Sequence, residues 1–392
     1  MNRKKIAFYI ESMVVGGAEK VLIDYVNNLN PNLYEVTVIA LFKKSVYNDY
    51  VFQFEEGFNP NVNYRYLINN ENTIWYRIFN FLYSKLNHRL FYRWLVGEKF
   101  DIEIAFYEGW PTEFVSCSDN NSVKIAWLHT QQERLYAHVS RERKAELHII
   151  YKQFDKIISV SDAVGQSFSS LFADMFTVTI YNPFNLDLIR EKANQSVDYN
   201  PEEGVVNFLT VGRFIEVKGY QRLIKAMSIC RDEGFVFTLT MIGDGELLNK
   251  LQELVIEFHL EEQIAILGHR SNPYPYMKKA NCLICSSYAE GFGNVIVESL
   301  AVRTPVISTD CGGPFEIVNK SAGGIVCENT DLDLLEKIRS VLRNPGIFMD
   351  IKKNMNSMDD LFSVSNAICE LEKVFYSKIT IDNVDNSFYT NI

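Results

Sequence analysis

The sequence predicts an α/β protein with two doubly wound domains, each built on a parallel sheet. In both halves of the chain, short apolar runs alternate with longer segments of helical spacing. This alternation is typical of parallel strands flanked by helices. The length of 392 residues also exceeds the size at which one hydrophobic core usually stops growing, so we expect two domains.

The apolar runs place the strands and the domain boundary. Strands are predicted at residues 6–10, 36–41, 102–106, 123–128, 156–160, 205–211, 235–242, 264–267, 282–285 and 305–308. Residues 187–204 are polar and lack apolar periodicity, which predicts a linker. We therefore expect an N-terminal domain at 1–190 and a second domain at 204–365. Residues 366–392 should form a C-terminal helix that closes the chain and a tail, packing back toward the N-terminal domain.

Composition excludes several function classes. The net charge of -10 argues against a general nucleic-acid binder, which needs a basic footprint. The seven cysteines are scattered, without the spacing of a disulfide framework, and this favours a cytoplasmic protein. No apolar stretch approaches the roughly 20 residues that a membrane span requires. We expect the protein to be cytoplasmic, either in solution or at the inner face of the plasma membrane.

Glycine-rich turns follow several predicted strands, where a parallel sheet binds its ligands and helix N-termini favour anions. These turns are Gly16-Gly17, Gly212-Arg213, Gly243-Asp244-Gly245, Glu290–Gly293 and Gly312-Gly313-Pro314. A dinucleotide-type G-x-G-x-x-G is absent after the first strand, and no P-loop motif occurs in the chain. The pattern therefore argues against dehydrogenases and phosphoryl-transfer enzymes.

The segment from Ser286 to Glu298 is the most informative motif. Glu290 and Glu298 are separated by seven residues, with glycines between them. If a helix begins near Asn294, the amides of Phe292–Val295 can face a diphosphate, with Glu290 before the helix and Glu298 about one turn inside. One carboxylate could then face a sugar and the other a ribose. For an arbitrary pair of glutamates at this spacing, the simpler interpretation is that Glu290 is a loop charge and Glu298 a solvated helix residue. The glycines between them favour a ligand-binding site instead.

Two cations follow the strand at 205–211. Arg213 and Lys218 could neutralise a leaving diphosphate. Solvated surface charges are the alternative for both residues. Cys282 and Cys285 form a C-x-x-C, but they lie in an apolar strand without a second pair, so buried packing is favoured over zinc binding.

Taken together, these motifs resemble those of glycosyltransferase family 4, a large retaining group. The resemblance covers nearly the whole chain and rests on Gly16–Glu19, Ser-Val-Ser at 159–161, Asn182-Pro183, Gly212-Arg213, Lys218-Gly219, Gly243-Asp244-Gly245, Gly268-His269, and the pair Glu290 and Glu298. It implies the GT-B fold, in which two Rossmann-like domains face each other across a cleft. The N-terminal domain would bind the acceptor and the C-terminal domain the nucleotide sugar.

The resemblance also implies roles for individual residues. The catalytic group would be Arg213 and Lys218 at the donor diphosphate, Glu290 at the sugar hydroxyls and His129 beside the sugar and acceptor. Without the family, His129 is more simply a packed or capping histidine. The substrate-binding residues would be Gly16, Gly17, Gly243, Phe292, Gly293, Asn294, Val295 and Glu298, with Glu298 at the ribose. One departure is Arg303, which stands where family members often carry glycine.

The expected function is that of a retaining, metal-independent glycosyltransferase without a resident cofactor. It would move a hexose or N-acetylhexosamine from a nucleotide sugar to a glycan or a polyprenyl-diphosphate-linked oligosaccharide. A UDP-sugar is favoured over a GDP-sugar as the donor. The expected process is bacterial surface polysaccharide biosynthesis. Double displacement needs a carboxylate nucleophile, and the sequence offers no obvious candidate, so we favour same-face attack. A GT-B nucleotide-sugar epimerase and a non-catalytic scaffold of a glycan assembly complex are the alternatives.

Residues 72–97 form a basic and aromatic stretch without any acidic residue. Its aromatic residues alternate with Arg77, Lys85, Arg89 and Arg93. Helices of this kind can lie on anionic lipid, so we predict a peripheral membrane contact through 72–97. The alternative is that many of these aromatic residues belong to the core of the N-terminal domain.

Overall fold

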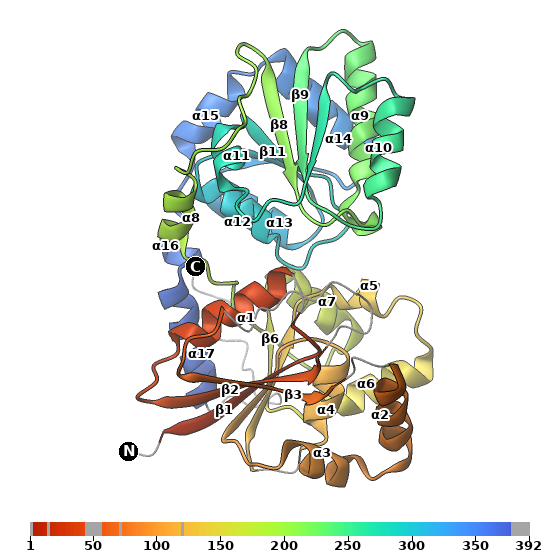
Figure 1. The fold of residues 1–392 in the computed structure, drawn as a ribbon, viewed down its shortest axis with the longest axis vertical. Coiled ribbons are helices and arrows are strands. Elements are labelled where there is room, and N and C mark those ends of the chain that lie inside the picture. The colour runs from red at the N-terminus through yellow and green to blue at the C-terminus, as the bar shows by residue number, and fades with distance from the viewer. Residues whose placement is uncertain (1–2, 14–15, 44–56, 70–72, 119–120, 378–392) are drawn as a thin grey trace. The chain divides into compact units, whose positions relative to one another are not determined.

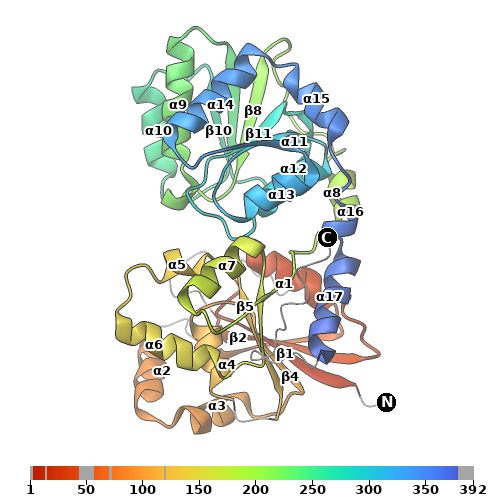
Figure 2. The same cartoon turned by 180° about the vertical axis from the view of Figure 1, so that it is seen from behind.

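The chain forms two units, each with its own parallel sheet and hydrophobic core (Figures 1 and 2). The computed structural model describes residues 3–13, 16–43, 57–69, 73–118 and 121–377. Unit 1 comprises Met1–Phe184 and Val364–Ile392, and unit 2 comprises Asn185–Ser363. The chain therefore passes from unit 1 into unit 2 after Phe184 and returns after Ser363.

Unit 1 is built on a seven-stranded sheet in the order β3-β2-β1-β4-β5-β6-β7, with every neighbouring pair parallel. Its strands are β1 Lys4–Ile10, β2 Tyr34–Phe42, β3 Val62–Ile68, β4 Ile102–Ala105, β5 Val123–Leu128, β6 Lys156–Ser159 and β7 Val178–Thr179. Its helices are α1 Gly17–Asn28, α2 Thr73–Lys85, α3 His88–Val96, α4 Trp110–Ser116, α5 Gln132–Leu135, α6 Arg141–Tyr151, α7 Asp162–Leu171 and α17 Val364–Tyr376. The strand order reverses between β1 and β4.

Unit 2 has the six-stranded order β10-β9-β8-β11-β12-β13, again parallel throughout. This is the strand order of a doubly wound Rossmann sheet. Its strands are β8 Val206–Val211, β9 Phe237–Ile242, β10 Ile264–Gly268, β11 Cys282–Cys285, β12 Val306–Thr309 and β13 Gly324–Cys327. Its helices are α8 Leu186–Lys192, α9 Tyr220–Asp232, α10 Leu248–Glu257, α11 Tyr274–Lys279, α12 Asn294–Ala301, α13 Gly313–Ser321, α14 Asp331–Arg343, α15 Ile347–Asn354 and α16 Asp359–Phe362, and Glu216–Lys218 forms a 3-10 turn.

The helices cover the sheets with the apolar faces that their sequences define. In α14, Leu334, Ile338 and Val341 recur at helical spacing and are fully buried, while Thr330 caps the helix by accepting from the Asp333 amide at 3.2 Å. α14 packs against α9, and α9 packs against α10. The central strands β4, β11 and β12 are buried throughout because helices cover both faces of each sheet.

The two parallel sheets confirm the predicted Rossmann-like domains, and each predicted strand is present. β3, β7 and β13 were not predicted. β3 and β13 are edge strands, and their half-exposed residues lack the continuous apolar run of a central strand. β7 has only two residues.

The segment 187–204, which we predicted to be a polar linker without apolar periodicity, begins within a helix that has an apolar face. α8 spans Leu186–Lys192 and belongs to unit 2. Leu186, Ile189 and Ala193 form its buried stripe, with exposures of 5%, 4% and 5%. The other face of α8 carries polar residues, so the average composition of the segment does not reveal these apolar positions.

The C-terminal helix is present as α17 and packs inside unit 1 against α1. The rings of Tyr34 and Phe375 meet edge to face at 5.9 Å. The buried ammonium of Lys156, on β6, donates to the carbonyl of Val374 at 2.6 Å and to the carbonyl and hydroxyl of Ser377. Lys156 thereby binds carbonyls at the C-terminal end of α17, where a cation is favoured. Residues 378–392 lie outside the described residues.

We predict that Lys156→Ala destabilises unit 1 by roughly 2 kcal/mol, because hydrogen bonds from a charged donor to Val374 and Ser377 are lost. Lys152→Ala is the matched control. Its ammonium pairs with Asp174 at 3.0 Å but is half exposed, so the loss should stay below about 1 kcal/mol. Urea unfolding followed by tryptophan fluorescence measures this, since every tryptophan lies in unit 1. Equal losses in the two variants would contradict the role of Lys156.

Candidate functional site

The candidate site of unit 2 lies where the strand order of its sheet reverses. β8 and β11 are neighbours there, although α9, β9, α10, β10 and α11 separate them in the chain. Ligands of doubly wound sheets bind beyond the carboxyl ends of such strands. Residues 212–219 follow β8, and residues 286–293 follow β11. These two loops carry most of the predicted site residues.

Backbone contacts hold the two loops together. The Tyr288 amide donates to the Val217 carbonyl at 2.8 Å, and the Ser286 hydroxyl donates to the Lys218 carbonyl at 3.0 Å. Gly219 makes the closest approach, since a Cβ there would lie 2.2 Å from the Ser286 carbonyl oxygen, and its φ is +64°. Only glycine fits this position without displacing the backbone.

The guanidinium of Arg222, on α9, fixes the loop after β11 from beneath. Nε donates to the Ser286 carbonyl at 2.8 Å, and Nη2 donates to the Ser287 carbonyl at 2.7 Å and to Asn329 Oδ1 at 2.9 Å. The same group stacks on the Tyr288 ring at 3.9 Å. Arg222 is only 4% exposed. Sequence reasoning missed it, although an arginine among the apolar positions of a helix signals a buried charge that needs partners.

Lys218 and Glu290 form a tight ion pair between the loops. Lys218 Nζ lies 2.6 Å from Glu290 Oε1, and the Ser287 hydroxyl donates to the same oxygen at 2.6 Å. Burial acts to lower the pKa of Lys218, but the Glu290 carboxylate outweighs it and the pKa is raised. The ammonium therefore stays charged. Arg213, which is exposed on the same loop, is close enough for its charge to act on Lys218.

α12 begins at Asn294, which confirms the predicted start of this helix. Gly293 caps it with a φ of +97°, a left-handed conformation that favours glycine. The Ile296 amide donates to the Gly293 carbonyl at 2.9 Å, and the positive end of the helix dipole here favours an anion. Glu298 lies about one turn into α12, and the Tyr274 hydroxyl donates to its Oε1 at 3.1 Å. Phe292, before the cap, is buried.

Gly243 brings a third loop to the same end of the sheet. It follows β9, and a Cβ there would lie 1.9 Å from the Gly212 carbonyl oxygen. The predicted site residues of unit 2 thus all lie on the loops after β8, β9 and β11 or on α12. These residues are Arg213, Lys218, Gly243, Glu290, Phe292, Gly293, Asn294, Val295 and Glu298.

The remaining predicted residues, His129, Gly16 and Gly17, lie in unit 1. His129 follows β5, and its ring stacks on Tyr107 with centroids 5.5 Å apart and an interplanar angle of 16°. Its Nε2 is buried without a hydrogen-bond partner among the described residues. Burial lowers the pKa of His129 to about 3, so the imidazole is neutral near pH 7. Gly16 precedes α1, which begins at Gly17.

Glu108 positions the His129 loop and was missed by sequence reasoning. Its Oε1 accepts from the amides of His129 at 2.7 Å and Thr130 at 2.8 Å, and from Gln132 Nε2 at 2.8 Å. The carboxyl is only 4% exposed. Glu108 follows β4 and His129 follows β5, so the contact joins two neighbouring loops at the carboxyl edge of this sheet. The signal in the sequence is an acidic residue three positions after the end of a buried strand.

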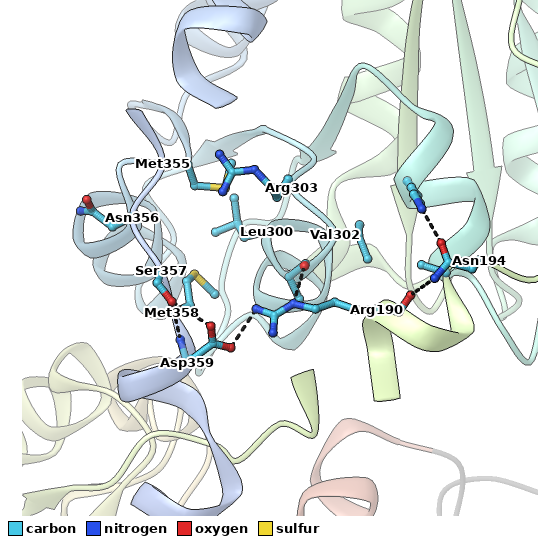
Figure 3. Close-up of a pocket in the computed structure, with 13 residues that line it drawn as sticks. Arg190, Asn194, Leu300, Val302, Arg303, Met355, Asn356, Ser357, Met358 and Asp359 are labelled. Atoms are coloured by element: carbon cyan, nitrogen blue, oxygen red, sulfur yellow. Dashed lines mark hydrogen bonds and ion pairs between the residues drawn. The ribbon is translucent and has the colours of Figure 1, made fainter. Parts of the chain in front are cut away.

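The cavity drawn in Figure 3 is distinct from this site. It has a volume of about 380 Å³ and lies in unit 2 between α8, the end of α12 and the segment before α16. Arg190 crosses it, donating to the Ala301 carbonyl at 3.4 Å and pairing with Asp359 at 2.8 Å. Arg303, at its wall, has a φ of +60°. Glycine adopts this left-handed conformation readily, which explains why the family that this sequence resembles often carries glycine at the position of Arg303.

Comparison with solved structures identifies the fold as GT-B. The structure of Anabaena HepE in complex with UDP and glucose matches with a TM-score of 0.72 and 18% sequence identity, covering 95% of this chain and 99% of that chain. At this identity the likeness shows the fold alone.

The family comparison concerns the second unit. Residues 191–358 match the family described as glycosyl transferases group 1, and this range contains every predicted site residue of unit 2. An uncharacterized glycosyltransferase of Methanocaldococcus jannaschii is 30% identical over 214 residues, which is 51% of this chain and 51% of that protein.

A Campylobacter jejuni protein, N-acetylgalactosamine-N,N'-diacetylbacillosaminyl-diphospho-undecaprenol 4-alpha-N-acetylgalactosaminyltransferase, is 30% identical over 167 residues. The match covers 42% of this chain and 44% of that protein. The chain thus spans about half the length of the curated relatives that it matches.

We predict that Glu108 gives unit 1 a pH-dependent stability. Burial raises the pKa of Glu108 from 4.5 to about 7, against the opposing effect of its hydrogen bonds. Because the folded pKa is raised, this contribution to stability is fully present below pH 4.5 and is lost as the pH rises through about 7. Relative to Glu108→Gln, which keeps an oxygen acceptor, the wild type should lose up to about 3 kcal/mol over that range.

Urea unfolding followed by tryptophan fluorescence at several pH values measures this difference. Glu113→Gln, which removes a less buried carboxylate from α4, is the control and should leave the pH dependence close to that of the wild type. If the stability of wild type and Glu108→Gln changes in parallel with pH, the carboxyl of Glu108 does not titrate as described.

Proposed function

We propose that this chain is a retaining, metal-independent glycosyltransferase of family 4. It transfers a hexose or N-acetylhexosamine from a UDP-sugar to a hydroxyl of a glycan or polyprenyl-diphosphate-linked oligosaccharide. The observation that carries the proposal is the Lys218–Glu290 pair, which lies at the reversal point of the unit 2 sheet, ahead of the N-terminus of α12. The match of residues 191–358 to the group 1 glycosyl transferases supports it.

In the proposed donor site, different side chains bind the diphosphate, the ribose and the sugar of the nucleotide sugar. Lys218 and Arg213 bind the diphosphate together with first-turn amides of α12. Glu298, oriented by the Tyr274 hydroxyl at 3.1 Å, accepts from the ribose hydroxyls. Glu290 keeps acceptor capacity beyond its bonds to Lys218 and Ser287, so it can accept from hydroxyls of the sugar.

In the proposed reaction, the bond between the anomeric carbon and the diphosphate oxygen breaks, and UDP leaves with the bonding electrons. The acceptor hydroxyl attacks from the same face, and its proton passes to the leaving phosphate oxygen. Lys218 and Arg213 stabilise the charge that develops on the diphosphate. Glu290 is not assigned the role of a nucleophile, because same-face attack needs no carboxylate nucleophile and Glu290 is assigned to the sugar hydroxyls.

The comparisons support a class of donor and acceptor. HepE was crystallised with UDP and glucose, and the Campylobacter relative is named for a diphospho-undecaprenol acceptor. A role in bacterial surface polysaccharide synthesis and a cytoplasmic location stay predictions from the sequence. The roles of His129, Gly16 and Gly17 at the sugar and phosphates also stay predictions.

We predict that UDP raises the melting temperature of the protein more than GDP does. A ligand that binds the native state at 100 times its Kd adds roughly 2.7 kcal/mol of stability. Thermal shift with UDP, GDP and a panel of UDP-sugars measures the preference, and EDTA should leave the shift unchanged. A larger shift with GDP would contradict the proposed base.

The reaction itself is tested by incubating the UDP-sugar that binds best with lipid-linked oligosaccharides. UDP release that depends on the acceptor, with an α-linked product from an α-linked donor by NMR, is expected. Conversion of the sugar without acceptor would identify an epimerase, and donor binding without turnover would favour a scaffold.

We predict that Lys218→Ala lowers kcat by on the order of 100- to 1,000-fold, as removal of a group that stabilises transition-state charge does. Lys225→Ala, an exposed lysine on α9, is the matched control and should retain full activity. Glu290→Gln should also lower turnover, because the amide cannot pair with Lys218. Initial rates of UDP release with saturating donor measure these effects. Near-normal activity of Lys218→Ala in a folded protein would refute the assignment.

A further inference from the structure

α2 of unit 1 is apolar on two opposite faces. Tyr76, Phe79 and Tyr83 point inward, where Phe79 packs on the ring of Phe42 at 5.2 Å and Tyr83 on that of Trp110 at 5.3 Å. This bears out the core alternative for these aromatic residues. The opposite face carries Ile74, Ile78 and Phe81, spaced by one helical turn, with exposures of 55%, 39% and 62%. Because α2 has a second apolar face, that face needs an apolar environment other than the core of unit 1.

α3 repeats this arrangement with charges added. Phe91, Tyr92 and Val96 are buried. On the outer face, Leu90 and Trp94 stand one turn apart and are 63% and 71% exposed. Arg89 and Arg93 stand one turn apart beside them and are exposed as well. The outer face of α3 therefore presents two large apolar side chains flanked by two guanidinium groups.

The charge of this segment is opposite to that of the whole protein. The chain carries a net charge of -10, yet residues 73–97 contain no Asp or Glu. Arg77, Lys85, Arg89 and Arg93 are all exposed. Figures 1 and 2 show α2 and α3 on the periphery of unit 1, near α4 and α6. Residue 72, included in the predicted contact, lies outside the described residues.

We propose that the outer faces of α2 and α3 bind the surface of an anionic phospholipid bilayer. Leu90, Trp94 and the apolar face of α2 enter the boundary between headgroups and acyl chains, and the four cations contact lipid phosphates. α2 has 13 residues and α3 has nine, so both lie in the interface. None of the helices in the described part of the chain is long and apolar enough to cross a bilayer.

An anionic bilayer is favoured over a protein partner by the composition of this face. Each outer turn of α3 combines a large apolar side chain with a guanidinium group. Residues 73–97 add four exposed cations and no Asp or Glu, so the charge of this face complements an anionic lipid surface. Trp94 also has the amphipathic ring that membrane interfaces enrich. The proposal does not depend on the donor site, and its test uses no sugar substrate.

The test is sedimentation of the full-length protein with phosphatidylglycerol vesicles and with phosphatidylcholine vesicles. The wild type should bind the anionic vesicles and lose binding as salt rises. Arg89→Glu with Arg93→Glu should lower the partition coefficient by at least roughly tenfold, at about 1 kcal/mol per cation. Lys250→Glu with Lys353→Glu, two exposed lysines of unit 2, is the control with the same charge change and should bind as the wild type does. Trp94→Ala should lower binding by roughly tenfold without a change of charge.

Three results would overturn the proposal. The first is equal sedimentation of wild type and the Arg89 and Arg93 variant. The second is equal binding of the wild type to both vesicle types, which would remove the role of the cations. The third is a dimer in light scattering that becomes a monomer in Trp94→Ala, which would identify a second copy as the partner. Circular dichroism confirms that each variant is folded.

Discussion

The candidate donor site depends on one buried cation. Arg222 holds the carbonyls of Ser286 and Ser287 at 2.8 and 2.7 Å, and these residues begin the loop that carries Glu290. A buried guanidinium that is 4% exposed costs free energy, and the bonds of Nε and Nη2 to the loop offset part of this cost. With the loop fixed, Ser287 and Lys218 both reach the same oxygen of Glu290. The geometry at the end of the sheet therefore follows from a contact beneath it.

Unit 1 uses the same architectural principle with the charge reversed. There a buried carboxylate, Glu108, gathers the amides of His129 and Thr130, whereas in unit 2 a buried guanidinium gathers carbonyls. In unit 1 the contact joins loops that follow the neighbouring strands β4 and β5, whereas in unit 2 it joins α9 to the loop after β11. Each loop is thus held by the hydrogen bonds of a buried charged side chain. This rigidity suits sites in which side chains must keep their positions.

The proposed anion contacts of the protein use cations in two different places. The chain is acidic overall, and two pairs of its cations lie in different settings. Lys218 and Arg213 lie at the carboxyl end of the unit 2 sheet, where an anion would be held by amides as well. Arg89 and Arg93 lie beside exposed apolar side chains on α3, where a flat anionic surface would be met. Net charge alone excludes neither kind of partner, because short-range groups decide each contact.

The sequence by itself determined the two parallel sheets, their central strands and the start of α12 at Asn294. These features are encoded locally, by apolar runs, helical spacing and glycines at turns. Only the tertiary structure decided that Arg222 lies under the loop after β11, 64 residues away, and that Glu108 holds His129, 21 residues away. It also decided which aromatic residues of α2 and α3 face the core. The spacing of apolar residues shows which of them share a face of a helix. It does not show which face is buried, because the residues that cover it come from distant parts of the chain.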